Sequence, residues 1–448
     1  MATSGKTIGL NILGLLIIKA ISMASSLATI PALLSYFDGN KNLLGTWLAF
    51  FTFTAIAISL DLGIGNRLKN DILSRISCNC DYSELITESL GSQFLVSLAI
   101  SFIVLAGSLT MWSTPDASTE IGRIAQQHPE LLIFAIACIV FSMPLRLSYF
   151  ILQAQQRNAA SALIALLPQL AVLLYATIAT NRLTPPPDFL ALASVLLTAN
   201  VAAYLSPFVF IPDLKIKSLF KEIYQKPLSL LFRSQIRKIR HAFPFFLVQI
   251  FIIFLYGYNE LFYLVAGTTV DIVHYQYYFR PFSLFSVGFS IISLPFWSAI
   301  RISQLNKDHK KTRKLFGSII LLNIPVAIAA APLVYFYQDI LDAWLGRGAF
   351  LASDLMLLIF SISSIFTCIL HSTSSILSGY DLIRFQAKAL GIGLLAKIII
   401  LIALVGLKIE TDPVMISTTI GLLFVVITFS LKSIKVWKTY LTNPDLTS

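Results

Sequence analysis

The sequence PDLKIKSLFKEIYQKPLSLLFRSQIRKIR, residues 212–240, is a basic stretch between two long apolar regions. It holds eight Lys and Arg residues against two acids, Asp213 and Glu222. Loops rich in Lys and Arg stay on the cytoplasmic face when the flanking apolar spans insert into a membrane. We therefore expect a cytoplasmic linker over 212–240. It joins an N-terminal bundle, 1–211, to a C-terminal bundle with a cytoplasmic tail, 241–448, and each bundle has an even number of spans.

The composition of the whole chain is that of a membrane protein. Of its 448 residues 56% are apolar and only 12% are charged, whereas soluble proteins carry about 25% charged residues. Apolar runs of about 20 residues, long enough to cross a hydrocarbon core of about 30 Å, recur throughout. A membrane β-barrel is excluded because its strands would be short and alternating. The net charge of +11 arises from loop cations, so we expect no nucleic-acid partner.

Twelve apolar segments divide equally between the two halves. We expect an all-α polytopic membrane protein in which 12 transmembrane helices form two six-helix bundles around a central cavity. A charged loop, 66–88, follows the second span. The expected spans are 9–36, 44–64, 89–112, 130–153, 158–179 and 189–210, then 241–265, 272–300, 315–337, 354–378, 385–407 and 414–431.

Lys and Arg gather in alternate loops, which predicts that both termini lie in the cytoplasm. The longest loop on the outer side, 113–129, is too short to hold a soluble domain. The first apolar run is too long for a cleavable signal peptide. We therefore expect the function to be carried out within the membrane.

Four cations fall inside the expected spans. Each one costs about 2.5–3.5 kcal/mol to insert near a helix centre. Together they cost on the order of 10 kcal/mol, which is comparable to the stability of a whole protein. A water-filled cavity or an anionic ligand would compensate, so the four are candidate substrate-binding residues. They are Lys19, with snorkelling as the alternative, Arg146, with a structural role, Arg280, with pairing to Glu260, and Lys397, with structural pairing.

Glu260 is the one acid that we place deep inside a span, and His371 lies within another. Both are candidates for coupling transport to protons or sodium. The alternatives are pairing with Arg280 for Glu260 and helix packing for His371. We expect no metal site, because the C-x-C pair of Cys78 and Cys80 has no second ligand pair.

The imbalance between four cations and one deep acid predicts a cavity of net positive charge. Such a cavity suits a cargo with an anionic group. Arg grips phosphate through paired hydrogen bonds, and Lys adds a point charge. A cation exporter would need the opposite sign.

The stretch LDLGIGNRLKN, residues 60–70, resembles the D-x-G-x-G-N-x-x-x-N signature of the O-antigen and polysaccharide flippase family. That family belongs to the multidrug/oligosaccharidyl-lipid/polysaccharide exporter superfamily. In physical terms, the glycines allow a tight exit from the span, and Asp61 is expected to cap a helix or to pair with Arg67. The signature residues are Asp61, Gly63, Gly65, Asn66 and Asn70. The resemblance extends to GTWLAFFTF, residues 45–53, and to Glu260, Gly267, Val273 and Tyr275.

This resemblance implies a flippase in the bacterial inner membrane. It would move an undecaprenyl-pyrophosphate-linked oligosaccharide, the unit of O-antigen in lipopolysaccharide or of another surface polysaccharide, from the inner to the outer leaflet. It implies alternating access by a V-shaped pair of bundles, no enzymatic activity and no cofactor. The implied partners are the lipid-linked substrate, membrane lipid, a polysaccharide polymerase and a chain-length regulator. Glu260 departs from the superfamily, which usually has Asp at this position.

Two other classes remain as alternatives. A multidrug or small-molecule exporter of the same superfamily predicts a cavity with several carboxylates, and only Glu260 fits. A polysaccharide polymerase or glycosyltransferase needs a sizeable outer loop or a D-x-D-like metal site, and the sequence has neither. A lipid II flippase would differ from the favoured function only in its sugars.

Overall fold

The computed structural model describes residues 5–77, 80–113, 120–155, 157–182, 188–210, 243–305, 308–408 and 411–442, and within these ranges it contains helices and no strand. The basic linker expected at 212–240 lies outside the described residues. The chain separates into two compact units. Unit 1 comprises Met1–Phe246 and Gly267–Val273, and unit 2 comprises Leu247–Ala266 and His274–Ser448.

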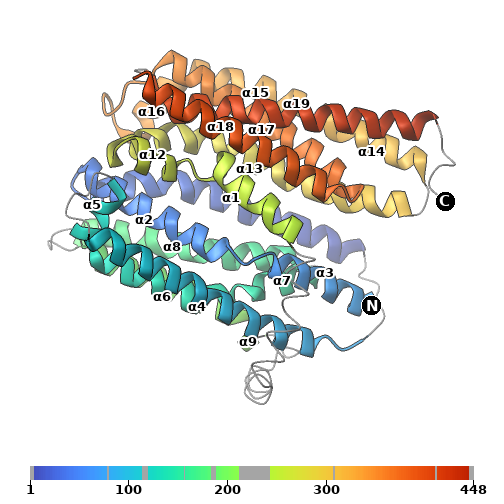
Figure 1. Ribbon diagram of the computed structural model, residues 1–448, viewed down its shortest axis with the longest axis horizontal. Helices are drawn as coiled ribbons and strands as arrows, with labels where there is room; N and C mark the ends of the chain where they lie inside the picture. Colours follow the sequence, from blue (N-terminus) through green and yellow to red (C-terminus); the bar gives the residue numbers. More distant parts are fainter. Residues whose placement is uncertain are drawn as a thin grey trace. The chain divides into compact units, whose positions relative to one another are not determined.

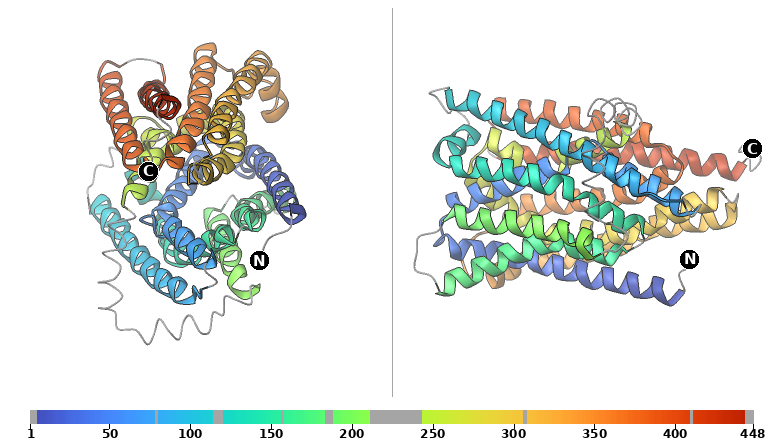
Figure 2. Two further views of the ribbon diagram at one scale, coloured as in Figure 1. Left: turned by 90° about the vertical axis from the view of Figure 1, so that its right-hand side faces the viewer. Right: turned by 90° about the horizontal axis from the view of Figure 1, so that it is seen from below.

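Unit 1 is built from long helices and three shorter ones, α3, α5 and α7 (Figure 1). Helix α6 packs against α2, α4 and α9, and α8 packs against both α1 and α9 (Figure 2). The helices are α1 (Gly5–Tyr36), α2 (Lys41–Ser59), α3 (Ile64–Ser77), α4 (Ser83–Ser113), α5 (Glu120–Gln127), α6 (Pro129–Leu145), α7 (Leu147–Ala154), α8 (Asn158–Arg182) and α9 (Phe189–Phe210).

The prediction of a charged loop over 66–88 is wrong, because much of this stretch is helical. The residues of α3 place Ile64, Leu68 and Ile72 on one face at helical spacing. All three are buried in a cluster with residues of α7, α8 and α9. The charged residues that suggested a loop therefore belong to the polar face of an amphipathic helix.

Unit 2 contains the remaining helices, except for residues 243–246 and 269–273, which begin the helix Phe243–Gly257 and α13 (Thr269–Leu305) and belong to unit 1. A cluster of mostly Leu, Val and Phe side chains from η1, α17, α18 and α19 forms an apolar core in this unit. The helices are Phe243–Gly257, which ends in the π-helix η1 (Ile253–Gly257), then α12 (Glu260–Ala266), α13 (Thr269–Leu305), α14 (His309–Leu321), α15 (Asn323–Tyr335), α16 (Tyr337–Leu345), α17 (Asp354–Gly379), α18 (Ile383–Gly406) and α19 (Pro413–Thr442).

The expected seventh span is not one continuous helix. The helix Phe243–Gly257 breaks at Tyr258 and Asn259, and α12 continues at an angle of 62° to it. The N–H of Tyr258 donates to the carbonyl of Ile253 at 3.0 Å, five residues back instead of four. Such π-turns are rare and occur often at functional sites.

The helices have the lengths and surfaces of membrane spans. Among the described residues ten helices are long and apolar enough to cross a membrane, or eleven if the bent pair counts as one span. The remaining expected span overlaps α13, which has 37 residues and carries Asp271 and Arg280.

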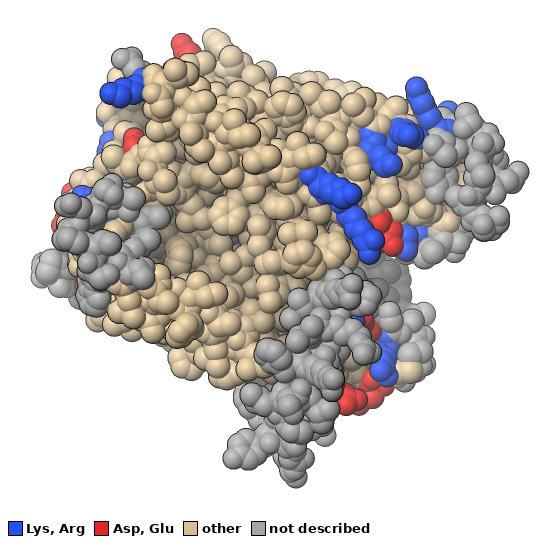
Figure 3. All heavy atoms as spheres, in the orientation of Figure 1, with Lys and Arg blue, Asp and Glu red and all other residues tan. Residues whose placement is uncertain are grey.

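Large apolar side chains on the outer faces of the helices are exposed. Phe102 is 72% exposed, and Ile402 is 67% exposed. On the face of unit 2 in Figure 3, Lys and Arg gather toward the ends. The chain is a multi-pass membrane protein.

Candidate functional site

The signature around Asp61 forms the corner between α2 and α3. Asp61 is 3% exposed, and its two carboxylate oxygens accept hydrogen bonds from the N–H groups of Gly63 at 3.0 Å and Gly65 at 3.1 Å. These groups lie at the N-terminus of α3, where N–H donors lack partners within the helix and a negative charge is stabilised. Asp61 is thus a helix cap. Arg67, the other partner expected for it, bonds to Asp71 at 3.4 Å.

The two glycines of this corner serve different needs. Gly63 has a φ of 76°, in the left-handed region that favours glycine. A Cβ on Gly65 would lie 2.2 Å from the ring of Phe150 in α7, so only glycine allows this close approach. Of the two asparagines, Asn66 is exposed. The side chain of Asn70 lies outside the described residues.

Arg146 occupies the short break between α6 and α7, two residues after Pro144. Its Nη1 donates to the carbonyl of Ile58 at 3.0 Å, near the C-terminus of α2. Helix C-termini leave carbonyl groups without partners and attract positive charge. Arg146 also attracts Asp61 electrostatically. The cation therefore stabilises the end of α2 and the acid stabilises the start of α3.

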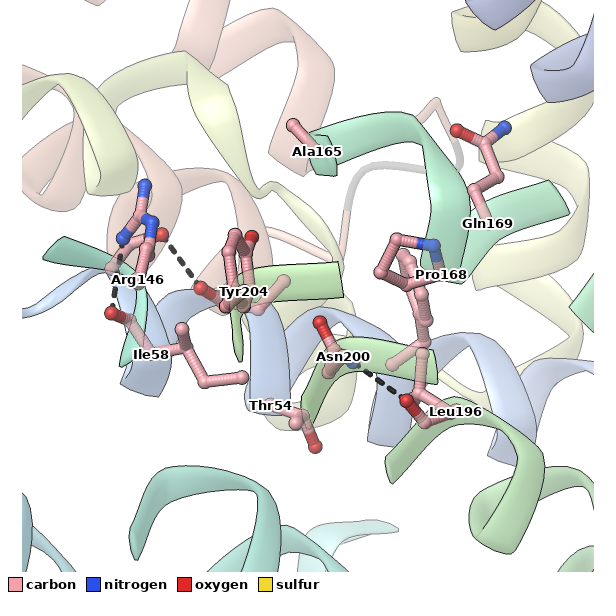
Figure 4. Close-up of a pocket in the computed structure, with 12 residues that line it drawn as sticks. Thr54, Ile58, Arg146, Ala165, Pro168, Gln169, Leu196, Asn200 and Tyr204 are labelled. Atoms are coloured by element: carbon pink, nitrogen blue, oxygen red, sulfur yellow. Dashed lines mark hydrogen bonds between the residues drawn. The ribbon is translucent and has the colours of Figure 1, made fainter. Parts of the chain in front are cut away.

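The same arginine lines a cavity inside unit 1 whose wall mixes polar and apolar residues (Figure 4). Asn200 lines it too and donates to the carbonyl of Leu196 at 2.9 Å. The hydroxyl of Thr54, also in the wall, is buried without a hydrogen-bond partner among the described residues. The cavity measures about 180 Å³, below the roughly 300–1,000 Å³ of sites that enclose a drug-sized ligand. It is large enough for a polar group of a ligand and too small for a whole glycan.

Lys19 lies half-buried in α1, and no described residue forms a hydrogen bond or an ion pair with its ammonium group. An ammonium group in such a place needs water or an anion.

Lys69 is a different case. Its Nζ, in α3, donates to Gln153 of α7 at 3.1 Å, and burial lowers the pKa of this ammonium group. The sequence had assigned Lys69 only to a charged loop.

In unit 2, Glu260 is 3% exposed at the start of α12, directly after the helix break. One of its carboxylate oxygens accepts a hydrogen bond from Nε2 of Gln276. The other is buried without a hydrogen-bond partner among the described residues. Gln276 in turn accepts a hydrogen bond from Nε of Arg280 at 2.7 Å. The expected pairing of Glu260 with Arg280 is thus bridged by an amide, and a buried acceptor is left over.

Lys397 is fully buried in α18. Its Nζ donates to the carbonyls of Phe254 at 2.8 Å and Leu255 at 3.0 Å and to Oδ1 of Asn259 at 2.7 Å. All three acceptors belong to the broken helix. The ammonium group is therefore enclosed by protein groups, and the structural alternative for this residue has direct support.

His371 lies half-buried in α17, in a row of small polar residues. Two members of this row, Ser374 and Ser378, form contacts between helices. Gln386 of α18 accepts from the hydroxyl of Ser374 at 2.8 Å and donates to the hydroxyl of Ser378 at 2.9 Å. Ser374 and Ser378 therefore join α17 to α18.

Sequence reasoning missed the acceptors that surround Lys397, especially Asn259 and the carbonyls before it. A signal was present in YGYNE, residues 256–260, because Gly and Asn are poor helix formers directly before a buried acid. Every residue has a backbone carbonyl group, so the sequence does not show which carbonyls accept hydrogen bonds from Lys397.

The fold resembles solved transporter structures. One is an inward-facing conformation of a multidrug resistance MATE family transporter of the MOP superfamily, with a TM-score of 0.64 and 15% identity over 98% of this chain and 99% of that chain. Another is the lipid II flippase MurJ in an inward closed conformation, with a TM-score of 0.64 and 18% identity over 97% of this chain and 93% of that chain.

A third is a MOP superfamily transporter from Pyrococcus furiosus, described as having a binding pocket of reverse polarity. It has a TM-score of 0.62 and 14% identity over 98% of this chain and 96% of that chain. In comparisons with protein families and with curated proteins, no match is found. At these identities the likeness establishes the fold alone.

Proposed function

We propose that this protein, whose fold is shared by the solved transporters above, is a flippase for a lipid-linked oligosaccharide. The cargo is an undecaprenyl-pyrophosphate-linked unit of a surface polysaccharide, moved from the inner to the outer leaflet of a bacterial inner membrane. Two findings support the proposal. Structures of this fold include a lipid II flippase, and the spans of this chain carry an excess of cations. The narrower resemblance to O-antigen flippases stays a prediction.

The observation that carries the proposal is the sign of the charge within the described spans. Glu260 is the one acid that they hold away from their ends, against Lys19, Arg146, Arg280 and Lys397. The amide of Gln276 links Arg280 to the acid, and protein oxygens enclose Lys397. Lys19 has no described partner, and Arg146 lines the cavity of mixed polar and apolar residues in unit 1. Unit 1 thus offers an anionic head group two cations, Lys19, which no described residue pairs, and Arg146, whose charge Asp61 balances in part.

Moving such a lipid needs solvation of its head and no covalent chemistry. In the proposed cycle, Lys19 and Arg146 stabilise phosphate oxygens, and Asn200 and Thr54 offer hydrogen bonds to sugar hydroxyls or water. Arg280 of unit 2 is a third candidate cation for the head group. The prenyl tail stays in the hydrocarbon of the membrane. Alternating access exposes the polar groups to each side in turn, as in transporters built from two repeats. Protons or sodium would drive the cycle, with Glu260 and His371 as the coupling candidates.

The test uses cells that lack the gene and receive Lys19→Ala or Arg280→Ala on a plasmid. We expect surface polysaccharide to fall at unchanged membrane levels of the protein, because each change removes a cation that meets the phosphates. Lys388→Ala, which removes an exposed cation of α18, is the matched control and should restore normal polysaccharide. Unimpaired polysaccharide in both test variants would refute the role of these cations.

Export of small molecules is a second candidate, because a multidrug resistance transporter has the same fold. The deletion strain separates the possibilities. Complete oligosaccharide units that accumulate on the inner leaflet indicate flipping. Greater sensitivity to toxic compounds with normal polysaccharide indicates drug export. Single units that reach the outer leaflet and stay unpolymerised indicate a polymerase.

A further inference from the structure

The environment of Lys397 has the chemistry of a cation site. Its Nζ lies within 3.0 Å of three oxygen atoms, the carbonyls of Phe254 and Leu255 and Oδ1 of Asn259. The nitrogen also lies 3.8 Å from the centre of the Phe262 ring, whose face attracts positive charge. Three acceptors require three donated protons, so the group is an ammonium ion and not a neutral amine.

This ammonium ion has no direct carboxylate partner. Its contacts in the described part of the chain include no ion pair, and Glu260 is the acid that acts on it electrostatically. Carbonyl and amide dipoles therefore provide most of the stabilisation of the ammonium charge. That is how channels and transporters hold monovalent cations, with oxygens that replace the hydration shell.

The break in the helix provides the oxygen atoms that surround Nζ of Lys397, which are the carbonyls of Phe254 and Leu255 and Oδ1 of Asn259. We call these three atoms the oxygen cage. In a regular helix the N–H of Tyr258 would bond to the carbonyl of Phe254, but here it bonds to Ile253 at 3.0 Å. The carbonyl of Phe254 is left for another donor, and Lys397 takes it. From α19 the hydroxyl of Thr418 donates to Asn259 at 3.1 Å, which orients the same amide oxygen toward the cage.

A close contact between α18 and α19 lies beside the lysine stem. Gly421 of α19 faces Lys397, and a Cβ at this glycine would lie 3.1 Å from Cβ of Lys397 and 2.8 Å from the carbonyl of Gly393. A glycine at this point allows α18 and α19 to approach closely with the lysine stem beside them. Three segments of unit 2, the broken helix, α18 and α19, thus converge on one ammonium ion.

We propose that this place is a monovalent-cation site that the protein fills with its own lysine. Lys397 is a tethered cation that holds the broken helix in position beside Glu260. The intact protein accordingly takes up no free sodium or potassium here, and removal of the side chain opens a site for a small cation. The inference rests on the contacts within unit 2 and not on the cargo.

The experiment measures thermal unfolding of the purified full-length protein at constant ionic strength. Choline chloride, whose cation is too large for the cage, is replaced stepwise by sodium, potassium or methylammonium chloride. We expect the wild-type Tm to be the same in all four salts. Lys397→Ala should unfold about 5 °C or more lower in choline. At least one of the small cations should raise its Tm again with a saturable dose dependence.

Lys397→Met is the matched control, since it fills the space with an apolar chain of similar length. Its Tm should be lowered and should not respond to the choice of cation. A wild-type Tm that rises saturably with sodium or potassium would overturn the proposal, as would a Lys397→Ala protein that ignores all three small cations. The wild-type comparison needs no variant, so the proposal stays testable if Lys397→Ala does not fold.

Discussion

At the scale of single residues, several charged side chains of this protein form hydrogen bonds with backbone groups at helix ends. Asp61 caps the start of α3, Arg146 bonds near the end of α2, and Lys397 bonds to carbonyls at the break before α12. Each charge meets backbone groups that a helix cannot pair by itself. These charged residues within apolar sequence thus have a structural role, and substitutions must separate it from the proposed role in transport.

Asp61→Ala removes both hydrogen bonds at the start of α3 and leaves the cation of Arg146 without its acid. We expect a loss of about 1–3 kcal/mol in the free energy of unfolding, because buried N–H groups lose their acceptor. Thermal unfolding in detergent measures it. Asn66→Ala, in the same signature but exposed, should change stability by less than about 0.5 kcal/mol. Equal losses in both variants would contradict the capping role.

Gly45→Ala tests the close approach between α2 and the start of α13 within unit 1. A Cβ at Gly45 would lie 2.1 Å from the carbonyl oxygen of Thr269, so the backbone would have to move. We expect a destabilisation of about 1–3 kcal/mol, typical of overpacking. The control is Gly107→Ala in α4, where the added Cβ meets nothing within 4 Å. Its better helix propensity should leave stability unchanged or raise it by up to about 1 kcal/mol. Chemical denaturation of both variants measures their free energies of unfolding. Equal stabilities of the two variants would contradict the close approach at Gly45.

At the scale of elements, the helix breaks and the close contacts between helices shape unit 2. The broken helix supplies the acceptors for Lys397 and places Glu260 at the start of α12. Helices α18 and α19 meet at two glycines, Gly393 and Gly421. Small residues let membrane helices pack closely, where van der Waals contact replaces the hydrophobic effect.

Gly393→Ala should separate α18 from α19. The new Cβ would lie 2.3 Å from Cγ2 of Val425 and 3.0 Å from the carbonyl of Gly421. We expect a lower Tm, with about 1–3 kcal/mol lost. Gly406→Ala, near the end of the same helix, has no atom within 4 Å of its added Cβ and is the control. If the two variants unfold at the same temperature, the glycine contact does not hold these helices together.

At the scale of the whole molecule, the chain is a multi-pass membrane protein with apolar outer faces on its helices. The distribution of Lys and Arg predicts which loops lie inside. A reporter enzyme that is active only outside the cytoplasm should be inactive when inserted within 212–240 or fused to the C-terminus. It should be active when inserted beside Arg347, in the turn after α16. The opposite pattern at equal expression would contradict the predicted orientation.

The sequence by itself determined the class of the protein and the order of its spans. Each expected span overlaps helical structure, because runs of apolar residues long enough to cross a membrane can satisfy their backbone hydrogen bonds only as helices. It also identified the signature at Asp61 and the charged residues within spans. Composition and local spacing carry this information, since both concern residues close together in the chain.

Only the tertiary structure decided what surrounds those charges. The sequence could not show that Lys397 meets the carbonyls of Phe254 and Leu255, that Gln276 separates Arg280 from Glu260, or that Arg146 reaches Ile58. Several of these partners are backbone atoms far away in the chain: the carbonyls that Lys397 meets lie 143 and 142 positions from it, and Ile58 lies 88 positions from Arg146. Whether a buried cation is open to a ligand or enclosed by the protein depends on packing between helices, and a one-dimensional pattern does not record that packing.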